Sequence, residues 1–153
     1  IMLTRRTDQT MDFDYAEVTT QSRENPVFYV QYAHARACSV LRQDDAVKID
    51  VSGANLGLLS DPAEMALIRL LASYPRQVEA AGQAFEPHRI AFYLMDLAAA
   101  FHGLWNKGRD DASLRFITDN TALTAARLKL VNATAVVIRN GFAILGVDAI
   151  NEM

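Results

Sequence analysis

The chain has 153 residues, of which 51% are hydrophobic and 22% charged, as expected of one folded domain with a sizeable core. Its formal net charge of −3 argues against a protein that coats DNA or RNA without selectivity. The single cysteine excludes an internal disulfide and a paired-cysteine zinc site. No signal-peptide pattern opens the chain, and no apolar run approaches the length of a membrane span. We therefore expect a cytoplasmic protein.

The first two predicted helices cover residues 14–21 and 26–42. Asp14 can cap the first of them. Asn25 can cap the second, and Pro26 fits its first turn, where the missing N–H costs nothing.

The second predicted helix carries Phe28, Tyr32 and Arg36 at i, i+4 and i+8, so that two rings and a guanidinium share one stripe. Such a stripe can hold unstacked nucleotide bases. Aromatic residues at helical spacing are also common in cores, and the spacing alone leaves both interpretations open.

The middle of the chain holds one predicted helix and one ambiguous segment. Apolar residues alternate over 47–51, which favours a short strand, but a strand without a partner makes no sheet. Residues 60–62 with Glu64 are a helix start. We expect Pro75 to kink or break that helix, with a further segment over 76–84.

Two long amphipathic helices are predicted in the last third of the chain. Glu86 and Pro87 open the first, and its core-facing stripe holds Ile90, Leu94, Leu97, Phe101 and Leu104. A turn is predicted at 108–110. The last helix is predicted over 121–140, ending or kinking at Asn140 and Gly141, with an inner face of Leu123, Leu130 and Val137. Four main helices with short connections predict an all-α helical bundle.

Catalytic patterns are absent from the sequence. The three histidines, His34, His88 and His102, have no metal-ligand spacing, and we expect each to be hydrogen-bonded or solvated. No glycine-rich phosphate loop is present.

Arginine outnumbers lysine twelve to three. The guanidinium group suits stacking and phosphate binding better than an ammonium group does, but a GC-rich genome would produce the same excess of arginine. The segment 114–140 contains Arg115, Arg127, Lys129 and Arg139 against one carboxylate, either a phosphate-facing surface or a solvated helix flank.

Three segments, read in order, resemble arginyl-tRNA synthetases. They are residues 2–42 with the motif QYAHARACSVLR, residues 87–106 reading PHRIAFYLMDLAAAFHGLWN, and residues 126–147 reading ARLKLVNATAVVIRNGFAILGV. The resemblance spans nearly the whole chain. It implies the all-helical DALR anticodon-binding domain over 23–153, with 1–22 as the end of the junction with the catalytic domain.

The resemblance also implies a function. Arginyl-tRNA synthetases are class I enzymes that use ATP and Mg²⁺ to join arginine to its tRNA, and their catalysis depends on HIGH-like and KMSKS-like motifs. Neither motif occurs here. We therefore expect a C-terminal part of the enzyme that is inactive alone, holds no cofactor or metal, and binds the anticodon stem-loop of arginine tRNA. Its other expected partner is the catalytic domain of the same chain, and we expect no membrane or DNA partner.

Carried over by position, the resemblance implies four tRNA-binding residues. Tyr32 would stack on an anticodon base, and Arg36 would hydrogen-bond to a base edge or a phosphate. Asn25 lies in the loop 21–25, which matches a segment that rearranges around the anticodon. Met153 matches a terminal methionine near the same loop.

Three points stay open at this level. Phe28 is expected to pack inward, and His34 is as consistent with packing as with binding. The tail at 148–153 departs from the Pro-Glu-Arg pattern of the family. Alternative functions are the related domain of the glycyl-tRNA synthetase beta subunit and a helical interaction domain that binds no RNA, which the acidic balance would suit.

Overall fold

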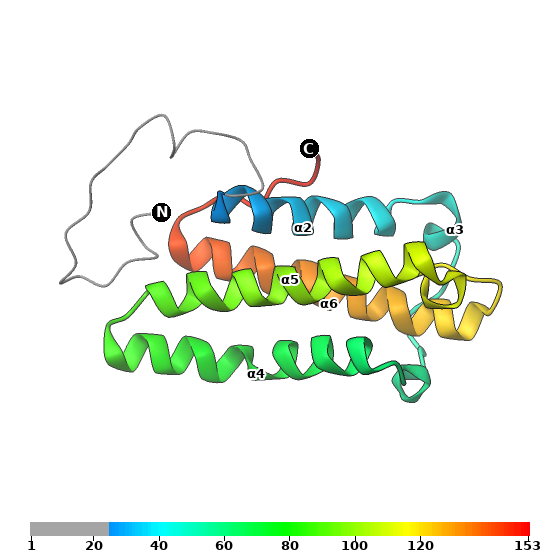
Figure 1. The fold of residues 1–153 in the computed structure, drawn as a ribbon, viewed down its shortest axis with the longest axis horizontal. Helices are drawn as coiled ribbons and strands as arrows, with labels where there is room; N and C mark the ends of the chain where they lie inside the picture. The colour runs from blue at the N-terminus through cyan, green and yellow to red at the C-terminus, as the bar shows by residue number, and fades with distance from the viewer. Residues whose placement is uncertain (1–24) are drawn as a thin grey trace.

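All regular structure in the computed structural model, which describes residues 25–153, is helical (Figure 1). The helices are α2 (Pro26–Leu41), α3 (Asp44–Val47), α4 (Pro62–Ala84), α5 (His88–Asp110) and α6 (Thr121–Leu145), with 3-10 turns at Leu56–Leu58 and Ala112–Leu114. The predicted all-α bundle is confirmed. The predicted helix over 14–21 and the boundary between 22 and 23 lie outside the described residues.

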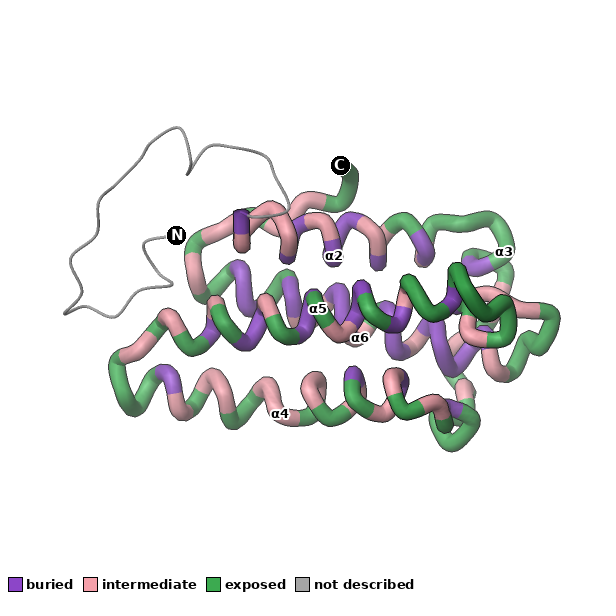
Figure 2. The backbone as a smooth tube through the Cα atoms, in the orientation of Figure 1, coloured by how far each residue is buried: buried purple, intermediate pink, exposed green. Residues whose placement is uncertain are grey.

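Helices α5 and α6 occupy the middle of the bundle, with α2 on one side and α4 on the other (Figure 1). The predicted core stripe of α5 is confirmed, because none of its five residues is more than 1% exposed. Helix α4 buries little of its surface, as Figure 2 shows, and only Glu64, Leu67 and Ala81 are fully covered. The stable centre of the fold is therefore the α2–α5–α6 face, where the site described below is built.

The predicted starts of α2 and α4 are confirmed by their capping hydrogen bonds. The Asn25 carboxamide oxygen accepts from the Val27 N–H at 3.1 Å. At the start of α4, Asp61 Oδ1 accepts from the Ala63 N–H at 2.7 Å. The Glu64 carboxylate accepts from the Asp61 N–H at 3.1 Å, which completes a capping box.

Helix α4 continues through Pro75, so the predicted break and the separate segment over 76–84 are wrong. A proline removes one hydrogen bond of the helix ladder. Side chains support the neighbouring turn, where the Leu70 carbonyl accepts from Ser73 Oγ at 2.7 Å and from Tyr93 Oη at 2.9 Å. Packing against α5 thus holds the helix together across the proline.

The turn predicted at 108–110 is wrong, whereas of the two possibilities left open for 47–51 the structure has the loop. Residues 108–110 form the last turn of α5 instead of a connecting turn. Gly108 is buried there because the following loop passes close to it, and an added Cβ would lie 3.0 Å from the Leu114 carbonyl oxygen. The alternating segment 47–51 contains the end of α3 and a loop, with Ile49 and Val51 half-buried against the core, so its alternation reflects loop packing.

Helix α6 runs beyond the predicted end at Asn140 and Gly141 and stops at Gly146, which adopts the left-handed conformation with φ 68°. Gly141 instead allows a close approach of α5, since a Cβ there would lie 2.7 Å from Leu94 Cδ2. The glycine that resembles a stop signal is a packing position.

Helix α6 buries more than one stripe because it contacts α2, α4 and α5. Of its predicted inner residues, Leu130 is buried, whereas Leu123 and Val137 are half-buried. By length and composition α6 is the one described helix that could cross a membrane, contrary to the expectation from the sequence. Its contacts with three helices account for its apolar composition.

Candidate functional site

Tyr32 and Arg36 lie side by side on α2 and meet two aromatic residues of α5. The guanidinium of Arg36 donates from Nη2 to Tyr32 Oη at 2.6 Å. Its Cζ atom lies 4.3 Å from the centroid of the Tyr32 ring and 4.6 Å from that of the Trp105 ring. Both distances are within the range of a cation–π contact. The structure therefore brings the two predicted residues together and adds a third.

His102 completes the support of Arg36. Arg36 Nη1 lies 3.0 Å from His102 Nδ1, and His102 Nε2 lies 3.4 Å from the Tyr29 carbonyl oxygen. Because a guanidinium can only donate, this arrangement requires Nδ1 as acceptor and places the ring proton on Nε2, facing Tyr29. No carboxylate in residues 25–153 lies within ion-pair distance of Arg36. Its positive charge is thus oriented by neutral groups and remains available to a ligand.

An open pocket of about 460 Å³ lies over these residues. It is lined by Tyr32, Ala35, Arg36, Ser39, Arg42, Trp105, Glu152 and Met153. Met153 is 60% exposed and reaches the pocket from the far end of the sequence. Two rings, a guanidinium and a thioether are suited to a flat, polar ligand that can stack and accept hydrogen bonds.

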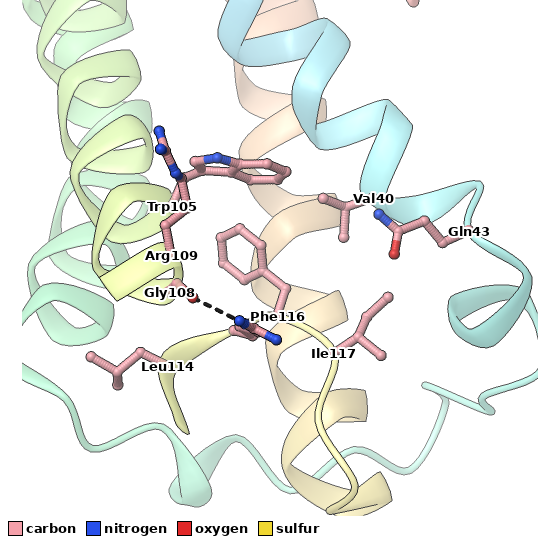
Figure 3. Close-up of a pocket in the computed structure, with 9 residues that line it drawn as sticks. Val40, Gln43, Trp105, Gly108, Arg109, Leu114, Phe116 and Ile117 are labelled. Carbon is pink, nitrogen blue, oxygen red and sulfur yellow. Dashed lines mark hydrogen bonds between the residues drawn. The ribbon is translucent and has the colours of Figure 1, made fainter. Parts of the chain in front are cut away.

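A second hollow of about 220 Å³ is shown in Figure 3. Its lining is mainly apolar, and Arg109 and Arg115 also contribute to it. The dashed line in Figure 3 is the hydrogen bond from Arg115 Nε to the Gly108 carbonyl, at 3.3 Å. Trp105 is the residue that the linings of the two hollows share.

The remaining residues of the predicted stripe and its neighbours lie outside the pocket lining. Asn25 is 5% exposed and its carboxamide caps α2, so the structure gives it a structural role. Phe28 is half-buried, and Tyr29 is the α2 aromatic residue that packs against the core. His34 is 1% exposed and hydrogen-bonds to the Ile150 carbonyl at 2.9 Å, so it packs against the segment after α6.

The cationic segment 114–140 does not form one surface. Arg127 is 4% exposed, and its Nε donates to Glu64 Oε1 at 2.7 Å. Arg127 therefore neither faces a phosphate nor lies on a solvated helix flank, the two alternatives given for this segment. Its side chain links α6 to the start of α4. Lys129 also bonds within the protein, to the Ser52 carbonyl at 3.2 Å.

Trp105 and His102 belong to the site but were not among the site residues predicted from the sequence. Trp105 is the only tryptophan in the chain, and that was its one available signal. No group of three His, Cys, Asp or Glu side chains that could hold a metal ion occurs within the described range.

The family model of the DALR anticodon binding domain matches residues 30–153. The chain is 58% identical over 160 residues to the arginine–tRNA ligase of Parvibaculum lavamentivorans and 55% identical over 163 residues to that of Rhodospirillum rubrum. Each alignment covers all of this chain and 27% of the relative, so the chain spans about a quarter of the length of the curated relatives it matches.

Solved structures agree with this relationship. Arginyl-tRNA synthetase of Thermus thermophilus superposes with a TM-score of 0.76 and 29% identity over 99% of this chain and 25% of that one. The Plasmodium falciparum enzyme, at 19% identity and a TM-score of 0.75, shares the fold over 99% of this chain and 25% of its own. The resemblance found in the sequence is confirmed, and the chain belongs to the DALR anticodon binding domain family.

Proposed function

We propose that this chain is the part of an arginine–tRNA ligase that binds the anticodon loop of arginine tRNA, at the pocket between α2 and α5. The observation that carries this proposal is the position of Arg36, a cation without a carboxylate partner in the described part, held between aromatic rings at an open pocket. The names of the relatives support arginine tRNA over the tRNA of the glycyl enzyme.

The geometry suits an unpaired base. Bases in a loop can leave their stack. Stacking of one such base on an aromatic side chain contributes about 1–3 kcal/mol to the binding free energy. The half-buried ring of Tyr32 lines the pocket, and the donors of Arg36 lie next to it for a base edge or a phosphate. Met153 closes the pocket on the other side.

In this proposal the pocket residues recognise the tRNA and do not form or break covalent bonds. Binding the anticodon would orient the tRNA on the whole enzyme, a form of induced fit. In this proposal ATP and Mg²⁺ serve the ligation step in the rest of the enzyme, which acts in the cytoplasm. The chain itself would contact only tRNA and its own catalytic domain, not a membrane or DNA.

The direct test is the affinity of the chain for an anticodon stem-loop of arginine tRNA, measured by fluorescence anisotropy over a salt series. We expect Kd to rise with salt, because phosphate contacts release counterions. A stem-loop with one anticodon base replaced should bind more weakly. Equal affinity for both RNAs would contradict anticodon recognition, and no binding at low salt would favour an interaction domain without RNA.

Tyr32→Ala is the matching variant. Loss of one stacking surface should weaken binding by about 1–3 kcal/mol, that is, about 5- to 150-fold in Kd. Phe85→Ala is its control, since Phe85 is 88% exposed at the end of α4 and lies outside the pocket lining. If both variants bind like the native chain, Tyr32 is not a contact residue.

A further inference from the structure

The segment after α6 follows a defined path along α2. Gly146 turns the chain at the end of α6, and residues 147–153, which we call the tail, then run beside α2 (Figure 1). The tail ends at Met153 in the lining of the pocket. Segments outside regular structure are commonly poorly ordered, so a defined path requires contacts that hold it.

Those contacts come from two polar side chains of α2, Gln31 and His34, and from Arg42, the residue that caps its C-terminus, which together we call the clamp. Their spacing of three and eight residues places them along one face of the helix. Gln31 Nε2 donates to the Asp148 carbonyl at 3.0 Å, His34 Nδ1 to the Ile150 carbonyl at 2.9 Å, and both Nη atoms of Arg42 to the Asn151 carbonyl at 3.2 Å.

Every one of these bonds ends on a backbone carbonyl. A backbone carbonyl is the same whichever residue supplies it, so the clamp specifies the path of the tail and not its side chains. This explains how the tail can differ in sequence from the family pattern and still bring Met153 to the pocket. The ion pair of Arg42 with Glu152, at 3.4 Å between exposed groups, adds little.

The clamp adjoins the pocket directly. Arg42 belongs to both, because it binds the tail and lines the pocket. Tyr32 follows Gln31 in sequence, so the face of α2 that holds the tail and the face that forms the pocket lie next to each other.

We infer that the clamp is a positioning device, in which Gln31 and His34 hold the tail so that Met153 forms one wall of the RNA pocket, and RNA binding in turn stabilises the docked tail. The inference rests on the proposed function. Its physical basis is pre-organisation, because a tail already ordered by the clamp need not be ordered when the RNA binds. Linkage requires that the effect be reciprocal.

The chain contains a natural reporter of tail docking. Cys38, its only cysteine, donates from Sγ to Asn151 Oδ1 at 3.6 Å. Burial raises the pKa of the Cys38 thiol, while Arg42 and Arg139 act in the opposite direction. Release of the tail uncovers this thiol, so its rate of reaction with Ellman's reagent measures how often the tail is undocked.

The experiment measures this rate and the Kd for the anticodon stem-loop in four proteins: the native chain, Gln31→Ala, Met153→Ala and the double variant. Gln31→Ala should raise both the thiol rate and Kd by about 2- to 10-fold, the effect of one lost hydrogen bond. Met153→Ala should raise Kd and leave the thiol rate of the free protein unchanged. The double variant should bind no more weakly than Met153→Ala, since Gln31 acts through Met153.

Two controls separate positioning from stability and from shielding. Asp148→Ala should change neither quantity, because the clamp binds the carbonyl of Asp148 and not its carboxylate. Saturating stem-loop should slow the thiol reaction in the native chain and do so much less in Met153→Ala. Direct shielding of Cys38 by RNA would slow the thiol reaction equally in the native chain and in Met153→Ala. Deletion of 148–153 gives the rate and Kd of a fully undocked tail if Gln31→Ala fails to fold.

The inference is overturned if Gln31→Ala raises the thiol rate without raising Kd, or if it weakens binding equally in the native and Met153→Ala backgrounds. It is also overturned if deletion of 148–153 leaves Kd unchanged. These results leave the proposed function intact, provided that the native chain binds the stem-loop. A native chain that does not bind the stem-loop overturns the proposed function and the inference with it.

Discussion

Arg36 and Arg127 are held in opposite ways by the same bundle. Arg127 is 4% exposed and donates to the Glu64 carboxylate at 2.7 Å and to the carbonyls of Ser113 and Arg115 at 2.6 and 2.7 Å. Arg36 is half-buried and meets aromatic rings and one histidine nitrogen. One charge is neutralised inside the protein, and the other is oriented toward an open pocket.

The difference separates a structural cation from a binding one. The Arg127 contacts join the start of α4, the loop after α5 and α6, three segments distant in sequence. Glu64 itself also accepts from the Ser60 and Asp61 N–H groups, so neither charge is left without partners. At Arg36 the residues of the described part, 25–153, supply orientation without a carboxylate, which leaves electrostatic attraction for an anionic ligand.

The largest expected effect comes from breaking the buried pair. Arg127→Met leaves the Glu64 carboxylate buried without its cation, which should lower the free energy of unfolding by about 3–5 kcal/mol. Urea unfolding followed by circular dichroism measures the change. The double variant Arg127→Met with Glu64→Leu removes both charges and should regain part of the loss. A loss below about 1 kcal/mol in the single variant would contradict a structural role for Arg127.

Arg36→Met should show the reverse pattern. The loss of a charged donor should weaken binding of the anticodon stem-loop by about 1.5–3 kcal/mol. Unfolding should change far less than in Arg127→Met, because no buried carboxylate is left behind. Anisotropy titrations and urea unfolding on the same preparations give both numbers, with exposed Arg89→Ala as the control. If Arg36→Met is as unstable as Arg127→Met, the contrast between the two arginines is wrong.

Two tyrosines extend the same contrast to aromatic residues. Tyr93 is 5% exposed and donates to the Leu70 carbonyl at 2.9 Å, whereas Tyr32 lines the pocket. Burial, with a smaller contribution from Tyr74, raises the pKa of Tyr93 to about 12. The folded state thus keeps the proton that the unfolded state releases near pH 10. Stability from this group is present below pH 10 and is lost as the pH rises toward 12.

Tyr93→Phe isolates that contribution. The native chain should lose about 1–3 kcal/mol more than Tyr93→Phe between pH 9.5 and 12, measured by urea unfolding at each pH. Parallel pH profiles for the native chain and Tyr93→Phe would show that Tyr93 ionises normally in the folded protein.

The sequence predicted those features of the fold and site that depend on local spacing. The Asn25 and Asp61 caps follow from short motifs, and the adjacency of Tyr32 and Arg36 follows from four residues of helix. Contacts between distant helices could not be predicted in this way. Trp105 joins the site only because α5 turns that face toward α2, and the resemblance alone indicated the approach of Met153.

The predicted end of α6 at Asn140 and Gly141 is wrong for a related reason. Gly141 and Gly146 carry the same local signal, and only Gly146 ends α6. The difference is the side chain of Leu94, which occupies the space next to Gly141. A neighbour 47 positions away in sequence decides whether a glycine ends the helix or packs inside it, and periodicity within α6 does not contain that information.

The smallest expected effect concerns Asp61, which is partly buried at the start of α4 beside the buried Glu64–Arg127 pair. The Ala63 N–H lowers the pKa of Asp61, and Lys107, 3.2 Å away, acts in the same direction. Stability from this carboxylate is therefore present above its unfolded pKa, near 3.8, and is lost as the pH falls below it. Asp61→Asn keeps an oxygen that can cap α4 and removes the charge.

We expect Asp61→Asn to cost less than about 1 kcal/mol at pH 7, because its ion-pair partner Lys107 is exposed to screening solvent and asparagine caps nearly as well. The Tm difference between the native chain and the variant should shrink toward zero between pH 4.5 and 2.5. A difference that persists at pH 2.5 would mean that the variant disturbs cap geometry and not charge.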